Sequence, residues 1–149
     1  MKEFLALLKR FDLKGIFITP TKNGFLQLFR YLFVGGIATV VDWGVLFGMT
    51  EVFAVHEMVS AVFGFTAGLI ANYLLSKLLV FSANEAKTGG FVEFLGYAII
   101  GIIGLGITEL IMLLGGFFPA VHYMLSKAAA TVVVLVWNYL ARKLLLYKN

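Results

Sequence analysis

Few residues in this chain can do polar chemistry, and two of them recur at a fixed interval. Asn72 and Lys77 are repeated 66 positions later as Asn138 and Lys143, and the same offset carries His56 onto His122. An amide can donate and accept hydrogen bonds, and an ammonium group attracts anions. Each copy therefore suits a polar, negatively charged ligand. The structural alternative is an amide that joins helices, with a lysine that reaches the membrane surface.

Three further ionisable residues lie in apolar surroundings. A charge at the centre of a bilayer costs at least ~2.5 kcal/mol on insertion scales, so it needs a partner or a function. Asp42 follows Arg30 by 12 residues, which is ~18 Å of helix and near mid-span. Glu109 and Lys127 are each nine residues from Phe118. We expect them to form an ion pair across an antiparallel helix pair, the alternative being that both face a polar cavity.

Other kinds of chemistry find little support in the sequence. The chain contains no cysteine, and its two histidines are read as turn residues because no carboxylate cluster accompanies them. There is no Ser/His/Asp ordering and no glycine-rich phosphate loop. We therefore expect neither an enzyme nor a metal or cofactor site.

Composition indicates the elements that must position these residues. The 149 residues are 61% hydrophobic with a mean hydropathy of +0.97, too apolar for a small soluble core. Four stretches, about 31–50, 58–81, 94–117 and 121–141, reach the roughly 20 apolar residues of a membrane span. We predict an all-α integral membrane protein whose four transmembrane helices form two tandem hairpins, 25–83 and 84–149.

Two local patterns refine this prediction. An amphipathic helix over 2–18, within a cytoplasmic arm of residues 1–24, is predicted to lie on the membrane surface, the alternative being a disordered basic tail. The glycine spacings 44/48 and 64/68 predict close helix packing.

Charge predicts the orientation of the spans. Eleven of the twelve Lys and Arg residues lie in the arm, at Arg30, in the 77–93 connection or near the C-terminus. By the positive-inside rule, both termini and the loop 82–90 are cytoplasmic in a cell membrane. No basic face stands clear of the membrane, so nucleic-acid binding is not expected.

The cations and amides of the two copies are predicted to meet. If the first hairpin turns near residue 52, Arg30 reaches a depth between Asn72 and Lys77. We expect Arg30, Asn72, Lys77, Asn138 and Lys143 to line one recess open to the cytoplasmic leaflet, with Arg142 nearby and Asp42 deeper. Hydrated cations at such an entrance suit a lipid phosphate.

Several short motifs resemble those of the GtrA-like family over about 25–147. They are Phe29-Arg30-Tyr31-Leu32-Phe33-Val34-Gly35-Gly36, then Thr39 and Asp42, Ala71-Asn72-Tyr73, and Lys77-x-x-Val80-Phe81. Arg30, Asp42, Asn72 and Lys77 match the family pattern, while Asn138 and Lys143 follow from the internal repeat. At the end of the second span the commoner family motifs are Asn-Arg and Trp-Thr-Phe. This chain differs there, with Ser76-Lys77 and Leu79-Val80-Phe81.

This resemblance implies a four-span protein of polysaccharide or teichoic-acid glycosylation. It would move a polyprenyl-phosphate-linked sugar to the outer leaflet, with a membrane glycosyltransferase as a second candidate partner and homo-oligomers as an open possibility. The alternatives are an anchoring subunit for a glycosyltransferase and a small proton-coupled drug exporter.

Overall fold

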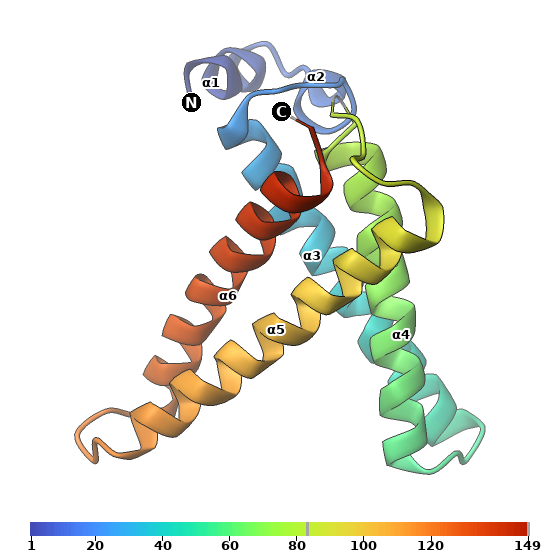
Figure 1. Ribbon diagram of the computed structural model, residues 1–149, viewed down its shortest axis with the longest axis vertical. Helices are drawn as coiled ribbons and strands as arrows, with labels where there is room; N and C mark the ends of the chain where they lie inside the picture. The colour runs from blue at the N-terminus through green and yellow to red at the C-terminus, as the bar shows by residue number, and fades with distance from the viewer. Residues whose placement is uncertain (83, 149) are drawn as a thin grey trace. The chain divides into compact units, whose positions relative to one another are not determined.

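A computed structural model describes residues 1–82 and 84–148, so Ala83 and Asn149 of the predicted hairpins lie outside the described residues. The chain divides into two compact units, Met1–Asn84 and Glu85–Asn149. The first unit contains α1 (Lys2–Lys9), α2 (Leu13–Phe17), α3 (Gly24–Phe47), η1 (Gly48–Val52), α4 (Glu57–Leu75) and η2 (Ser76–Val80). The second contains α5 (Gly90–Gly116) and α6 (Tyr123–Leu146) (Figure 1).

The predicted membrane spans are confirmed. Four helical stretches are long and apolar enough to cross a bilayer: Gly24–Val52, Glu57–Val80, Gly90–Gly116 and Met124–Leu146. In each unit the two long helices pack against each other and are joined by a short turn. The described residues contain no β-strand, only an isolated bridge between Ala86 and Tyr147. The protein is an all-α membrane protein of two helical hairpins.

Small residues bring the helices of the first hairpin together. A Cβ atom at Gly64 would lie 2.7 Å from the main-chain oxygen of Asp42, and one at Gly68 would lie 3.0 Å from that of Ala38. Only glycine permits so close an approach, as the 64/68 spacing predicted. The 44/48 spacing does not bring the helices of the first hairpin together, because Gly44 and Gly48 meet no neighbouring atom within 4 Å among the described residues.

Both long helices of the first unit end in a π-helical turn. The amide of Phe53 bonds the carbonyl of Gly48 at 3.2 Å, and that of Phe81 bonds Ser76 at 2.9 Å. Such bonds span five residues instead of four, so the turn is wider and its side chains are redirected. The apolar spans predicted at 31–50 and 58–81 gave no sign of these wider turns.

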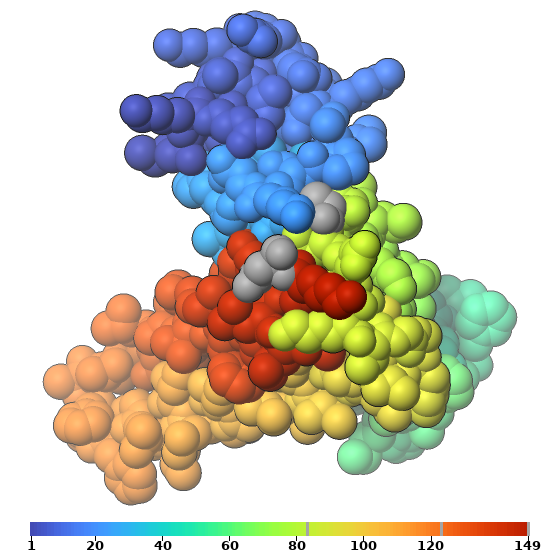
Figure 2. All heavy atoms as spheres, turned by 45° about the horizontal axis from the view of Figure 1, so that its top comes forward, coloured from blue at the N-terminus to red at the C-terminus, as the bar shows by residue number. Residues whose placement is uncertain are grey.

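The N-terminal arm forms two short helices where the sequence predicted one. Phe11 separates α1 from α2, and its φ of +50° is a left-handed conformation that a continuous helix does not contain. The Phe4 ring lies 4.8 Å from that of Phe29, and the Phe17 ring 4.9 Å from that of Phe33. The arm therefore packs on the first turns of α3, with which it forms a continuous surface in Figure 2.

The repeated histidines begin the second helix of each hairpin. The Nδ1 atom of His56 accepts a 3.2 Å bond from the amide of Met58, and Nδ1 of His122 accepts one of the same length from Met124. Each imidazole thus caps an amide that has no partner within its helix. This agrees with the turn role that the sequence predicted for both residues.

In the second unit, the polar connection pairs with the C-terminal segment. The Lys87 amide donates to Leu146 O at 2.8 Å, and the Lys148 amide donates to Glu85 O at 2.6 Å. Along the helices, a Cβ at Gly96 would meet the side chain of Leu146 at 2.6 Å. At the end of this hairpin opposite its turn at 117–122, hydrogen bonds therefore join residues 85–87 to residues 146–148.

Candidate functional site

Arg30 lies at the open end of the first hairpin, away from the turn at 53–56. Its side chain has only 1% of its surface exposed. Four main-chain oxygens accept hydrogen bonds from its guanidinium: Ile16 at 2.6 Å, Thr19 at 2.7 Å, Gly15 at 2.8 Å and Leu79 at 2.9 Å. Arg30 thus joins α3, the arm and η2 in one contact.

This geometry changes the role expected for Arg30. A hydrated cation at an entrance was predicted at this position, whereas the guanidinium is enclosed by protein carbonyls. A guanidinium carries five donors in a planar fork, which suits it to several acceptors at once. Leu79 belongs to the last turn of its helix, where carbonyls lack partners and cations are favoured. Arg30 organises the open end from inside.

The second helix of this hairpin carries an amide and a lysine near Arg30. The Ser76 hydroxyl donates to Oδ1 of Asn72 at 3.1 Å. Lys77 is exposed, and its Nζ lies 5.7 Å from the centre of the Tyr73 ring, a cation–π contact within one helix. Lys77, unlike Arg30, presents its charge at the surface of the hairpin. Ser76 and Tyr73 had not been singled out as site residues.

Asp42 lies deeper, in the seam between α3 and α4. It is half-buried, and a Cβ at Gly64 would lie 2.7 Å from its Oδ1 atom. Gly68, which also faces Asp42, precedes Asn72 by one helical turn. Asp42 and Asn72 therefore lie along one seam, with Asp42 on the side of the turn at 53–56.

The second hairpin carries a buried arginine at its own open end. The guanidinium carbon of Arg142 lies 3.5 Å from the centre of the Tyr97 ring, and Nη2 donates to Tyr97 O at 3.4 Å. The side chain of Arg142 is 2% exposed. Stacking on an aromatic face lowers the cost of burying a guanidinium.

Lys143 and Asn138 take positions like those of Lys77 and Asn72. Lys143 is half-buried, with Nζ 5.5 Å from the Tyr139 ring centre and 3.4 Å from its hydroxyl. Asn138 packs on Gly104, where a Cβ would come within 2.9 Å of Oδ1. That oxygen is buried and has no hydrogen-bond partner among the described residues. The corresponding oxygen of Asn72 accepts a hydrogen bond from Ser76, whereas that of Asn138 has no donor there.

A buried acidic pair in the second unit escaped the sequence analysis. The Tyr147 hydroxyl donates to Oε1 of Glu93 at 2.8 Å, and both residues are at most 1% exposed. Gln27 and Phe81, which stand 66 positions earlier, are also buried. Between the two copies of the repeat, Gln27 corresponds to Glu93 and Phe81 corresponds to Tyr147. These two changes together would have suggested the pair from the sequence.

Glu109 and Lys127 do not form the expected ion pair among the residues that the structure describes. Both are exposed on the second hairpin, and the ion pair recorded there joins Lys148 to Glu85 at 3.4 Å. The described residues also contain no group of three His, Asp or Glu side chains placed to hold a metal ion.

The fold and the polar groups define a class of protein. It is a small multi-pass membrane protein of two hairpins, each with a buried arginine and a lysine–tyrosine pair beside an amide at its open end. The chain matches the GtrA/DPMS transmembrane domain over residues 30–147 and belongs to that family. No solved structure matches the chain. The resemblance seen in the sequence motifs is thereby confirmed, from Arg30 to Tyr147.

Proposed function

We propose that this protein moves a polyprenyl-phosphate-linked sugar from the cytoplasmic to the outer leaflet of the cell membrane. The observation that carries the proposal is the lysine–tyrosine–amide set at the open end of each hairpin, in a chain of the GtrA/DPMS family. The basic termini support a cytoplasmic position for these open ends by the positive-inside rule.

Lys77 and Lys143 are the proposed phosphate contacts. Both hold their ammonium groups beside a tyrosine ring, which restrains the long side chain, while Lys77 stays exposed and Lys143 is half-buried. Arg30 and Arg142 contribute positive potential from within the protein while they maintain its structure. A phosphodiester is attracted to such a surface and remains able to leave, because none of these contacts is a preformed bidentate clamp.

The amides and Asp42 are the proposed sugar contacts. Oδ1 of Asn138 is buried without a donor in the described part of the chain, and a sugar hydroxyl supplies such a donor. Asp42 accepts hydroxyl bonds deeper in the seam and repels the phosphate. Transport needs no covalent step, since the prenyl tail stays in lipid and only the polar head must be shielded. We therefore propose a non-catalytic protein.

The test is leaflet exchange in reconstituted vesicles with a fluorescent polyprenyl-phosphate hexose. Lys77→Gln with Lys143→Gln should lower the initial exchange rate at least about tenfold, because two phosphate contacts are lost. Lys148→Gln is the matched control, since it removes a cation at an exposed ion pair. It should keep the rate of the unmodified protein.

Two results would decide against the proposal. Absence of exchange by the unmodified protein would favour an anchoring subunit for a glycosyltransferase. Export of a lipophilic cation driven by a proton gradient, without sugar-lipid exchange, would favour the drug-exporter alternative.

A further inference from the structure

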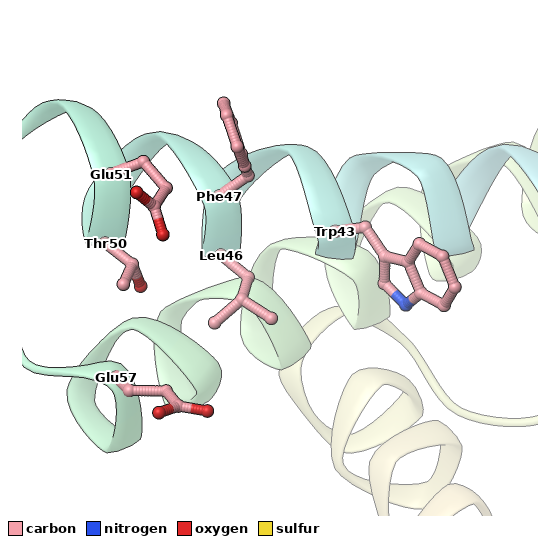
Figure 3. Close-up of a pocket in the computed structure, with 6 residues that line it drawn as sticks. All are labelled: Trp43, Leu46, Phe47, Thr50, Glu51 and Glu57. Atoms are coloured by element: carbon pink, nitrogen blue, oxygen red, sulfur yellow. The ribbon is translucent and has the colours of Figure 1, made fainter.

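A groove of about 430 Å³ lies at the turn end of the first hairpin, opposite Arg30 (Figure 3). It is lined by Trp43, Leu46, Phe47, Thr50, Glu51 and Glu57. Its residues come from α3, η1 and the first turn of α4. None of them belongs to the proposed phosphate and sugar contacts at the open end.

The π-helical turn accounts for the polar end of the groove. Thr50 and Glu51 belong to η1, whose wide turn follows the straight part of α3. The Glu51 side chain extends from η1 toward α4 with Thr50 beside it, and the Glu57 side chain lies along the first turn of α4 (Figure 3). No ion pair engages either carboxylate among the described residues. Such turns are rare in helices and are often found at functional sites.

Thr50 gives an independent indication of a missing ligand atom. Its Oγ1 atom is buried and has no hydrogen-bond partner in the described part of the chain. Helical threonines commonly satisfy their hydroxyl on a carbonyl one turn earlier, as Thr39 does with Gly35 at 2.9 Å. A buried hydroxyl without a partner costs free energy. A donor or acceptor supplied from the groove would remove that cost.

The other end of the groove is apolar and open. Trp43 is 69% exposed and Phe47 65% exposed, and Leu46 lies between Trp43 and the carboxylates in Figure 3. The groove is therefore amphiphilic along the helix axis: hydrogen-bond acceptors lie near the turn and an indole lies deeper in the span. A ligand of the same design has a hydroxylated head and a hydrocarbon tail.

We propose that this groove is a second, low-affinity site that receives the sugar head of the lipid after translocation, with the first isoprene units along Leu46 and Trp43. The proposal rests on the transport function above. Sugar hydroxyls are donors that two carboxylates and a threonine hydroxyl can accept. In the lipid the phosphodiester joins the sugar to the first isoprene unit, so the same carboxylates repel it and the groove holds the sugar-lipid only weakly.

The hairpin thereby acquires chemically opposite ends. Cations at the open end favour the phosphate, and carboxylates at the turn end favour the uncharged sugar. Binding that is strong at entry and weak at exit lets the lipid leave into the outer leaflet. A site that bound phosphate tightly at both ends would retain its product.

The test is a binding measurement that does not depend on transport. Trp137→Phe leaves Trp43 as the single tryptophan, and the full chain is placed in nanodiscs of zwitterionic lipid. Citronellyl β-glucoside and citronellyl phosphate are titrated while Trp43 emission is followed. We expect a saturable change with the glucoside and affinity for the phosphate at least about tenfold weaker.

Carboxylate variants separate this site from partition into lipid. Glu51→Gln with Glu57→Gln should weaken glucoside binding and abolish discrimination against the phosphate. Thr50→Val, which keeps the shape, should weaken glucoside binding alone. Glu85→Gln, a carboxylate on the other unit, should change neither. Circular dichroism and size-exclusion profiles confirm folding, and Glu57→Gln alone replaces the double variant if that variant does not fold.

Three outcomes would overturn the assignment. Phosphate binding equal to or tighter than glucoside binding contradicts it. A glucoside response that is absent, or that persists unchanged in both groove variants, shows that no such site exists. Tighter binding of citronellyl ammonium than of the glucoside identifies a cation site instead. Sugar-lipid exchange that continues in vesicles after any of these outcomes leaves the transport function intact.

Discussion

Arginine and lysine are put to different uses at the open ends of the two hairpins. Arg30 and Arg142 are buried and bonded to main-chain oxygens, whereas Lys77 is exposed. The guanidinium suits burial because it is weakly hydrated and offers a planar set of donors, while an ammonium group retains its water. In the function that we propose, internal structure and phosphate capture are thus divided between two kinds of cation.

The two buried arginines do not occupy corresponding positions of the internal repeat. Position 96, which corresponds to Arg30, is glycine, and position 76, which corresponds to Arg142, is serine. Each hairpin therefore has one buried guanidinium at its open end, supplied by the first helix in one unit and by the second helix in the other. Each hairpin end accommodates one such group, whichever helix carries it.

Arg30→Lys should release the N-terminal arm from the first hairpin. Lysine has one compact donor group and cannot satisfy carbonyls of the arm and of η2 together. Main-chain oxygens of Gly15, Ile16 and Thr19 lose their shared partner. We expect trypsin to cleave after Lys14 at least several-fold faster in nanodiscs, measured by mass spectrometry.

Lys77→Gln is the control for this change, because Lys77 contacts Tyr73 and is exposed. Equal cleavage rates in Arg30→Lys and the unmodified protein would show that the phenylalanine contacts alone hold the arm.

Sequence reasoning located these residues and missed their partners. Asn72 and Lys77 were found because the internal repeat marks them, and Arg30 because it lies at their depth and matches a family motif. The carbonyl cage of Arg30 had no such signal, since it depends on main-chain atoms of an arm 11 to 15 residues away. Tyr97 was likewise invisible as the stacking partner of Arg142, because it lies 45 residues away. The shared recess of both hairpins stays a prediction.

At the scale of elements, small residues at four-residue spacing organise the first hairpin. Ser60, Gly64, Gly68 and Ser76 are all buried along one face of α4 and η2, and Asn72 continues the same face. In membranes no hydrophobic effect drives helices together, so close backbone approach and interhelical bonds must do so. The same seam holds Asp42 and Asn72, which makes helix packing part of the site.

Gly64→Ala should loosen this seam. The added Cβ would lie 2.7 Å from both the main-chain oxygen and Oδ1 of Asp42, and overpacking of this kind costs about 1–3 kcal/mol. Gly44→Ala is the matched control on α3, because nothing described lies within 4 Å of its Cβ. We expect a lower midpoint of unfolding in SDS for Gly64→Ala and an unchanged or higher midpoint for Gly44→Ala. The reverse order would mean that Gly44 carries the packing.

Hydropathy was sufficient to predict the spans and insufficient for their ends. Four apolar runs of the right length gave four helices, since the bilayer imposes that length. The π-helical turns η1 and η2 depend on a single additional residue per turn, which no periodicity over a long window resolves. The break at Phe11 was missed for a similar reason: its neighbours Arg10 and Asp12 fit an amphipathic helix as well as a turn.

At the scale of the whole chain, most positive charge lies toward the open ends of the hairpins and none lies in their turns. The described connections 53–56 and 117–122 contain no Lys or Arg, and the groove at the first of them contributes Glu51 and Glu57. The arm, the connection 82–89 and the C-terminal segment hold most of the cations. The direction of transport that we propose depends on which of these sets faces the cytoplasm.

Single cysteines test that orientation directly, because the chain contains none. Thr88→Cys lies in the connection between the units and Ala120→Cys in the turn of the second hairpin, and both positions are exposed. The positive-inside rule predicts that a membrane-impermeant maleimide applied to intact cells labels the Ala120→Cys variant and spares the Thr88→Cys variant until the membrane is opened. Thr39→Cys, inside α3, should resist the reagent under both conditions. Labelling of position 88 from outside would mean that the lysines face the exterior and the carboxylate groove faces the cytoplasm. The phosphate would then be captured at the outer leaflet, and the proposed direction of transport would be wrong.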